Sequence, residues 1–248
     1  ASIAERPVAP HTTPSAIRAR LGDGRLPENG GDAAALLDEA TSILFDNSTF
    51  NGHPRFFGYI TASAAPIGVL ADMLAAAVNP NCGAWSLAPA ATEIERQAVR
   101  WVAEFIGFPT TSAGIFVSGG NMANMVCFLA ARTEHARRAG WDVRAKGVSG
   151  DAAKMTVYTS AETHTWVQKA AELFGLGDEA VRWIETDGAQ RMRMDRLRER
   201  IAEDRRAGLQ PFLVIVTGGS VSTGAVDPLP QIAALCRAEG LWFHVDGA

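Results

Sequence analysis

The strongest constraint on the fold is an alternation of short apolar segments with longer amphipathic ones in the second half of the chain. Runs rich in Val, Ile, Leu and Phe predict strands, and the stretches between them have the length and periodicity of helices. Strands separated by helical crossovers form a largely parallel sheet with helices on both faces, so we expect an α/β fold. The expected strands are 115–117, 155–159, 181–184, 212–216 and 241–245, and the expected helices are 121–139, 164–174, 195–208 and 228–238.

The first part of the chain predicts an extended arm followed by helices. About the first 30 residues are rich in Pro and Gly, which favours an arm that lies on another surface. Asp32 can cap a helix, and Pro66 can begin a second helix that runs to Val78. Further on, Thr92 and Glu95 form a capping-box pattern that predicts the start of another helix.

Composition narrows the classes of function. A net charge of -4 gives no reason to expect nucleic acid as a partner. No apolar run reaches the roughly 18 residues of a membrane span, and the first residues lack a signal-peptide pattern, so we expect a cytoplasmic protein with no membrane partner. Cys82, Cys127 and Cys236 lack metal-ligand spacing; we interpret them as buried thiols and expect no metal.

A glycine-rich turn leads from the first expected strand into a helix at Ser118, Gly119, Gly120 and Asn121. Glycines let the backbone approach an anion closely, and the N–H groups of a first helical turn favour a phosphate. Asn121 can cap the helix. A plain tight turn would use the same residues, so phosphate binding and simple turn formation both stay open on this segment alone.

Two further candidates follow the ends of expected strands. Asp246 could pair with a pyridinium nitrogen, or it could merely cap a turn. His164 could stack on a flat heteroaromatic ring and transfer a proton, or it could be a surface histidine. We interpret His244, which lies between apolar residues, as a hydrogen-bonded interior histidine. Since the carboxyl ends of parallel strands share one side of a sheet, the glycine-rich turn, Asp246 and His164 together suit a phosphorylated aromatic cofactor.

The chain resembles the group II decarboxylases, which depend on pyridoxal 5'-phosphate (PLP) and include the aromatic-L-amino-acid, histidine and glutamate enzymes. The resemblance extends from about residue 32 to the end, in the ordered segments HPRFFGYITAS, GAWSLAPAATEIE, VSGGNMANMVCFLAAR, TSAETHTWVQKAAELFG, TGGSVSTGAVDP and WFHVDGA. It implies fold type I, the PLP-dependent transferase-like fold, and a homodimer that acts on a small-molecule amino acid. We expect residues 1–85 to form the arm and a helical segment, and residues 86–248 an incomplete PLP-binding large domain.

The resemblance also implies roles for individual residues. Those implied at the cofactor are Gly119, Gly120 and Asn121 at the phosphate, His164 stacked on the ring, Asp246 at the ring nitrogen, Ala248 beneath the ring, and Ser220. His164 and Asp246 are the implied catalytic residues. Those implied on the substrate side, in part across the dimer interface, are His53, Phe57, Tyr59 and Trp85.

The chain departs from the family pattern at three points. Asn121 stands where a serine or threonine is usual, and Ser220 with Val221 replaces a pair of threonines. The Schiff-base lysine of the family lies beyond the HVDxA motif, and the matching context is missing around the lysines of this chain, Lys146, Lys154 and Lys169. We therefore expect a companion C-terminal polypeptide to carry that lysine.

The implied reaction is decarboxylation of an L-amino acid to the amine and CO2. Because fold and cofactor contacts are shared among different PLP chemistries, two alternatives stay open. One is a PLP-dependent carbon–carbon lyase of the sphingosine-phosphate type. The other is a catalytically inactive PLP-fold subunit that binds a partner. The residues do not indicate which amino acid is used.

Overall fold

The computed structural model describes residues 2–22, 24, 26, 28–59 and 61–248. Contacts within the chain define two compact units, Ala1–Leu87 and Ala88–Ala248. The assignment of residues 1–85 to an arm and of residues 86–248 to a cofactor-binding domain stays a prediction. Among the described helices, none is both long and apolar enough to cross a membrane.

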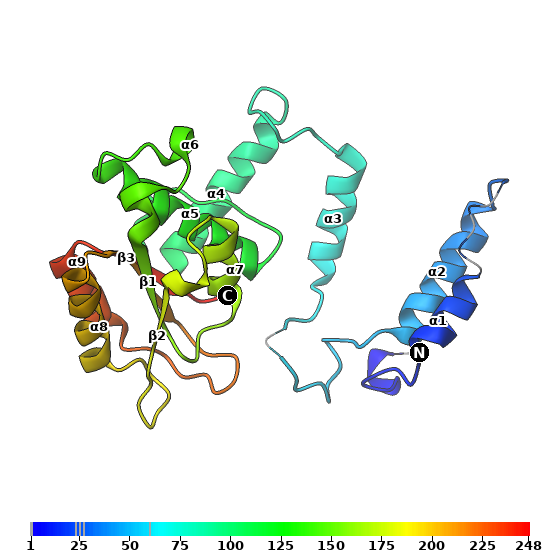
Figure 1. Ribbon diagram of the computed structural model, residues 1–248. Coiled ribbons are helices and arrows are strands. Elements are labelled where there is room, and N and C mark those ends of the chain that lie inside the picture. The colour runs from blue at the N-terminus through cyan, green and yellow to red at the C-terminus, as the bar shows by residue number, and fades with distance from the viewer. Residues whose placement is uncertain (1, 23, 25, 27, 60) are drawn as a thin grey trace. The chain divides into compact units, whose positions relative to one another are not determined.

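The first unit is built from helices and connecting loops (Figure 1). Its helices are the 3-10 helix η1 (Ile3–Glu5), α1 (Pro14–Leu21), α2 (Ala33–Asn47) and α3 (Pro66–Val78). Asp32 caps α2, since its Oδ2 accepts a hydrogen bond of 2.8 Å from the Ala35 N–H. Pro66 is the first residue of α3, where its fixed φ angle suits the helix and its missing N–H costs nothing. Both expected helix starts are confirmed.

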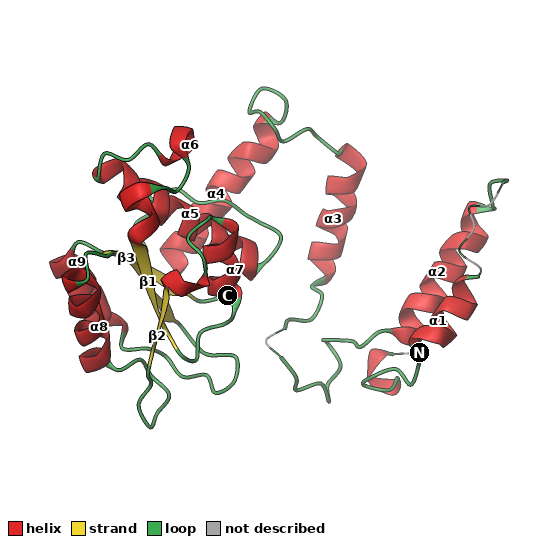
Figure 2. Ribbon diagram, viewed as in Figure 1, coloured by secondary structure: helices red, strands yellow, loops and turns green. Residues whose placement is uncertain are grey.

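The second unit contains a four-stranded sheet in the order β2-β1-β3-β4, and every pairing in it is parallel (Figure 2). The expected α/β fold with a parallel sheet is therefore confirmed. The elements of this unit are α4 (Pro89–Phe105), α5 (Gly120–Arg138), α6 (Val143–Lys146), η2 (Gly150–Lys154), β1 (Met155–Ser160), α7 (Trp166–Leu173), η3 (Asp178–Ala180), β2 (Val181–Ile184), α8 (Met194–Arg206), β3 (Gln210–Thr217), α9 (Leu229–Glu239) and β4 (Trp242–Asp246).

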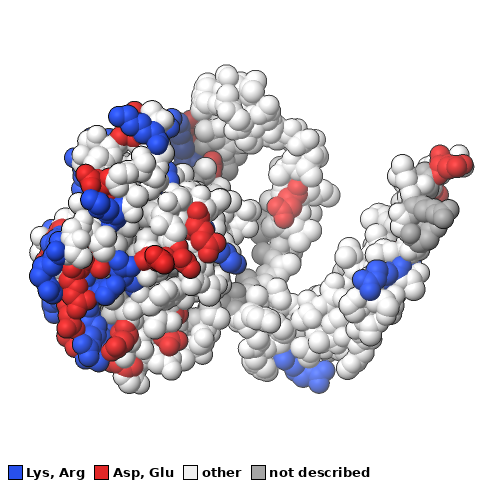
Figure 3. All heavy atoms as spheres, in the orientation of Figure 1, with Lys and Arg blue, Asp and Glu red and all other residues white. Residues whose placement is uncertain are grey.

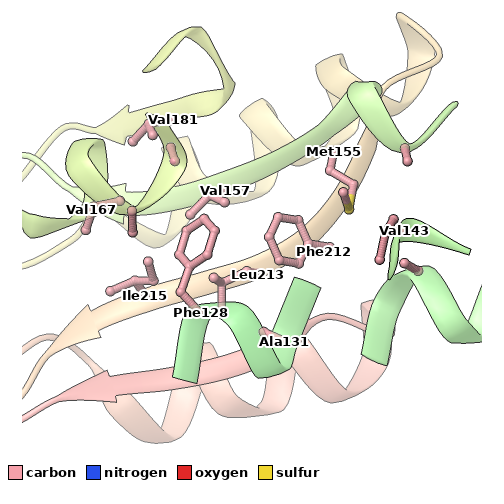
Figure 4. Packing of buried hydrophobic residues seen from close by; sticks show 14 of the residues in the cluster. Phe128, Ala131, Val143, Met155, Val157, Val167, Val181, Phe212, Leu213 and Ile215 are labelled. Atoms are coloured by element: carbon pink, nitrogen blue, oxygen red, sulfur yellow. The ribbon is translucent and has the colours of Figure 1, made fainter. Parts of the chain in front are cut away.

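Helices cover both faces of the sheet, as the alternating pattern predicts. On one face, Val157 and Ile215 pack with Phe128 of α5 and Val167 of α7 (Figure 4). On the other face, residues of β1 and β3 pack with α8 and α9 in a second cluster. That cluster consists of Tyr158, Ile184, Met192, Leu197, Ile201, Val214, Val216, Ile232, Cys236 and Leu241. The two buried layers fix the sheet, and with it the carboxyl ends of the strands.

The expected strand at 115–117 is wrong. The side chains of Ile115 and Phe116 are 61% and 55% exposed, and this extended segment pairs with no strand among the described residues. A strand needs a neighbour for its backbone N–H and C=O groups. The Phe116 N–H instead donates a 2.8 Å hydrogen bond to Oε1 of Glu95.

Two expected helix caps are also wrong. Thr92 lies inside α4, where its hydroxyl donates to the Ala88 carbonyl at 2.9 Å, because Pro89 already starts the helix. Asn121 does not cap α5, since Gly119 occupies the N-cap position and the helix has no side-chain cap. The residue pattern predicts that a helix begins in each region, but it does not identify the N-cap residue.

All three cysteines were expected to be buried, and this expectation is correct for one of them. Cys236 is buried in α9, whereas the thiols of Cys82 and Cys127 belong to exposed residues. Cys127 lies on α5 directly before the buried Phe128. Its exposure follows from helical periodicity, which turns neighbouring residues toward different sides.

Candidate cofactor-binding site

The start of α5 meets the end of the chain after β4. A Cβ atom placed on Gly120 would lie 2.6 Å from the Cβ of Ala248, so only glycine fits there against this alanine. Gly119 has a φ angle of 150°, in a region that side chains rarely adopt. With no side-chain cap on α5, the N–H groups of its first turn are available to an anion.

Asp246 ends β4 beside this turn and is 9% exposed. Its Oδ2 accepts a hydrogen bond of 2.7 Å from Nε1 of Trp166, and its Oδ1 accepts one of 3.2 Å from the Ala248 N–H. In the parallel register, Asp246 pairs with Thr217 of β3. A buried carboxylate therefore lies at the carboxyl ends of β3 and β4, on the side of the sheet where α/β folds usually bind ligands.

His244 lies two residues before Asp246 and is hydrogen-bonded, as expected for an interior histidine. Its Nε2 lies 2.7 Å from Oδ1 of Asn124, and because an amide oxygen only accepts, Nε2 is the donor. Its ring meets the Trp166 ring edge to face, with centroids 5.8 Å apart. Burial lowers the pKa of His244, and the charge of Asp246 acts in the opposite direction.

His164 lies in the loop between β1 and α7 with an exposed side chain. Its Nδ1 accepts a hydrogen bond of 3.3 Å from the Trp166 N–H, which fixes one edge of the imidazole and leaves Nε2 available. The preceding residue, Thr163, is buried, and its hydroxyl lies 3.2 Å from the hydroxyl of Thr217. The loop that carries His164 is thus attached to the end of β3.

Ser220 is buried in the loop that follows β3. Its Oγ lies 2.8 Å from Oγ1 of Thr223 and accepts a hydrogen bond of 3.2 Å from the Thr223 N–H. Asp227 closes this loop by accepting hydrogen bonds from the N–H groups of Thr217, at 2.8 Å, and Met192, at 2.7 Å. The Gly218 N–H donates to the Asp246 carbonyl at 2.7 Å, so the loop of Ser220 begins beside Asp246.

The four substrate-side candidates lie in the first unit. His53 is 2% exposed, and both ring nitrogens are in use: Nε2 lies 3.1 Å from the Arg6 carbonyl, and Nδ1 accepts from the Arg55 N–H at 3.0 Å. Phe57, Tyr59 and Trp85 have exposed side chains. The hydrogen bonds of His53 join the loop around it to the N-terminal arm.

Sequence reasoning missed the residues that hold the candidate site in place: Asn124, Thr163, Trp166 and Thr217. Asn124 had a detectable signal, since it is a polar residue on the helix face that also carries Phe128, and it is 5% exposed. Trp166 had no detectable signal in the sequence, because an aromatic residue at the start of an amphipathic helix predicts only core packing. Its hydrogen bond depends on the long-range approach of α7 to β4.

A parallel sheet with a glycine-rich helix start and a buried carboxylate at its strand ends agrees with the fold type I class of PLP-dependent proteins, to which the solved structures similar to this chain belong. The family model described as the pyridoxal-dependent decarboxylase conserved domain matches residues 14–248. The chain belongs to this family.

Relatives and solved structures agree with this assignment. An aromatic-L-amino-acid decarboxylase of Bacillus atrophaeus is 34% identical, over 98% of this chain and 48% of its own length. An acidic amino acid decarboxylase of Bos taurus is 34% identical, over 92% of this chain and 43% of its own length. The crystal structure of Oryza sativa TDC with PLP and tryptamine superimposes with a TM-score of 0.89 at 29% identity, over 100% of this chain and 51% of that one. The chain thus spans about half the length of these proteins.

The residues of this site fit PLP chemically. The first turn of α5 offers N–H groups to a phosphate, and Asp246 offers a buried carboxylate to a pyridinium nitrogen. The site therefore has complementary groups for both charged ends of the cofactor.

Proposed function

We propose that the enzyme containing these residues decarboxylates an L-amino acid to the corresponding amine and CO2, using PLP. The observation that carries the proposal is the buried Asp246 carboxylate, which two hydrogen bonds hold next to an uncapped glycine-rich helix start. Membership of the pyridoxal-dependent decarboxylase family supports the same reaction class. When bound, PLP supplies the electron sink for the electron pair that is left when CO2 departs.

The residues of the second unit divide the work of holding the cofactor. Gly119, Gly120 and Asn121 bind the phosphate, mainly through backbone N–H groups and the positive end of the α5 dipole. Asn121 adds an exposed amide where family members usually place a hydroxyl. Ser220 arranges the loop beside Asp246 through its hydrogen bonds with Thr223.

Asp246 and His164 provide the chemistry. The Asp246 carboxylate keeps the ring nitrogen protonated, because an opposite charge nearby favours the charged form of a base. His164 would stack on one face of the bound ring, and Ala248 would pack on the other. Since Nδ1 of His164 accepts the Trp166 N–H, the neutral imidazole carries its proton on Nε2, and Nε2–H is the group that can donate toward the substrate.

The first unit contributes to substrate binding in a homodimer. We propose that the interface buries the arm before Asp32 and the loop from His53 to Tyr59. The exposure of Phe57, at 91%, and of Tyr59, at 87%, supports this, since large apolar side chains favour a covered position. Trp85 takes part on the same substrate side.

The identity of the amino acid stays open between at least two classes. One relative is named for aromatic and another for acidic amino acids, and both are 34% identical to this chain. The companion polypeptide with the Schiff-base lysine, the homodimer and the cytoplasmic location stay predictions.

Replacement of Asp246 by alanine in the complete enzyme tests the proposal. Loss of a buried ion pair costs about 3–5 kcal/mol, so kcat should fall roughly 100-fold or more. Release of CO2 from a panel of aromatic and acidic L-amino acids gives kcat, and absorbance titration gives PLP affinity. Asp178→Ala, which removes an exposed carboxylate from the same unit, is the control. Near-normal decarboxylation by Asp246→Ala would falsify the role of Asp246, and an unaltered enzyme that binds PLP but releases no CO2 from any amino acid would contradict the reaction.

A further inference from the structure

Trp166 is a buried aromatic residue of the candidate site, and no role in cofactor binding has been proposed for it so far. It is 1% exposed and is the first residue of α7. Its ring meets Phe128 of α5 edge to face, with centroids 6.4 Å apart, and meets His244 of β4 in the same way at 5.8 Å. Contacts from two other elements thus restrict the position of the indole ring.

The indole N–H of Trp166 makes one well-defined polar contact. Its Nε1 donates to Oδ2 of Asp246 at 2.7 Å, a short distance typical of hydrogen bonds to charged acceptors. An indole N–H is a donor only, so this hydrogen bond always points from Trp166 to the carboxylate. The bond joins the rigid start of α7 to the end of β4.

The Asp246 carboxylate is held at both oxygens but keeps free acceptor capacity. Oδ1 accepts from the Ala248 N–H at 3.2 Å, and Oδ2 accepts from Trp166. A carboxylate has about four acceptor positions, so two remain for a further donor. Rotation of the carboxylate would break both existing hydrogen bonds and leave a buried polar group unpaired.

A second hydrogen bond fixes the surface against which the indole packs. His244 donates from Nε2 to Oδ1 of Asn124, which is 5% exposed on α5. The imidazole therefore cannot turn without losing this bond, and its contact with Trp166 keeps the indole N–H directed at Asp246. The helix that starts at the phosphate turn is in this way linked to the carboxylate.

We propose that Trp166 is a positioning residue that sets the orientation of the Asp246 carboxylate for the ring nitrogen of PLP. The inference rests on the proposed function, in which Asp246 binds that nitrogen. Trp166 touches neither substrate nor cofactor in this role and acts only through Asp246. Its contribution should therefore vanish once the carboxylate is removed.

A double-mutant cycle in the complete enzyme tests the proposal. Trp166→Phe keeps an aromatic ring but removes the N–H. It should weaken PLP affinity and lower kcat by about 10-fold each, the size expected for one lost hydrogen bond to a charged group. The KM for the amino acid should stay unchanged. On the Asp246→Ala background, Trp166→Phe should have no further effect on PLP affinity, because coupled residues are not additive.

Trp141→Phe is the matched control, because it makes the same change at a residue that packs on the same hydrophobic cluster and contacts His135. It should leave PLP affinity unchanged. Additive losses for Trp166→Phe and Asp246→Ala, or an unchanged PLP affinity in Trp166→Phe, would overturn the positioning role. Full PLP affinity and activity in Asp246→Ala alone would instead contradict the proposed function, so the two failures are distinguishable.

An isosteric replacement covers the case in which Trp166→Phe does not fold. Incorporation of 3-benzothienylalanine at position 166 replaces the indole N–H by sulfur and keeps the ring size. The expected result is the same 10-fold weaker PLP binding, about one lost charge-assisted hydrogen bond, with an unchanged melting temperature of the apoenzyme. Unchanged PLP affinity in this variant would overturn the proposal.

Discussion

The two units of the chain differ in how far they bury their apolar side chains. The second unit buries two hydrophobic clusters, one on each face of its sheet. Among the described residues of the first unit, only His53 is buried, and apolar residues of α2 and α3 such as Leu37, Leu70 and Leu74 are more than half exposed. Figure 3 shows few charged residues on the visible face of the first unit and many on that of the second.

This difference indicates that the two units are stabilised in different ways. Burial of apolar surface is the main favourable term in folding, so the second unit has its own source of stability. The first unit has helices that are locally well specified but little buried surface. Its apolar side chains are best explained as a contact surface, in agreement with the proposed homodimer.

The largest expected effect is that of Phe128→Ala in the second unit. Phe128 is 1% exposed and its ring contacts those of Trp166, Phe174 and Phe212. Removal of a buried phenyl ring should reduce the free energy of unfolding by about 3–5 kcal/mol. Denaturant titration of the complete protein measures it. A loss below about 1 kcal/mol would show that this cluster is not the source of stability.

A smaller effect is expected from Leu70→Asp on α3, and it should depend on protein concentration. Leu70 is 55% exposed, so a charge there costs little within one chain but disfavours an interface. Dimerisation should weaken by roughly 2 kcal/mol, or about 30-fold. Analytical ultracentrifugation measures it, with Leu70→Met as the control. An unchanged dissociation constant would remove α3 from the interface.

Next in size is the loss of the α2 cap in Asp32→Ala. Asp32 accepts the Ala35 N–H at 2.8 Å, and replacing such a cap by alanine typically costs about 1 kcal/mol. Hydrogen exchange should become faster in the first turn of α2 and stay unchanged in the sheet of the second unit. Asp38→Ala removes the same charge from within α2 and should leave exchange of that turn as it is. Equal effects of the two variants would exclude capping as the cause.

The smallest expected effect is a pH dependence of the second unit. Burial, followed by the charge of Arg138, lowers the pKa of His135, whose Nε2 is buried without a partner among the described residues. The unfolded chain then binds the proton more readily than the folded one. The contribution of neutral His135 to the free energy of unfolding is fully present above about pH 6.5. It is lost as the pH falls through the pKa of the folded state, with a slope of at most ~1.4 kcal/mol per pH unit. His135→Phe should flatten this dependence in denaturant titrations, and an equally steep dependence in that variant would assign it to other groups.

The strands of the sheet could be predicted from the sequence because each strand is marked by its own short apolar segment. The short apolar and β-branched segments that form β1 to β4 are recognisable in the sequence, and the structure places the strands within two residues of the expected bounds. The segment 115–117 has the same composition but lacks a partner strand among the described residues. Strand propensity therefore indicates where a strand can form, and pairing decides whether it does.

The candidate site was predictable in part. The glycine-rich turn and Asp246 follow from the rule that ligands bind at strand ends, and the structure brings Gly120, Asp246 and Ala248 close together. Trp166 could not be predicted, since its role depends on a 2.7 Å contact between residues far apart in the sequence. The roles of all these residues stay predictions until the cofactor is bound.

The contact between Gly120 and Ala248 has a consequence for how this protein can vary. With the two positions so close, a methyl group added at position 120 needs the space that the Ala248 side chain occupies, whereas Gly120 has no side chain to lose in exchange. A library that randomises position 120 alone should therefore recover almost only glycine. A library that randomises both positions should recover Gly120→Ala only together with Ala248→Gly, a correlated signature of the contact that is readable by sequencing alone.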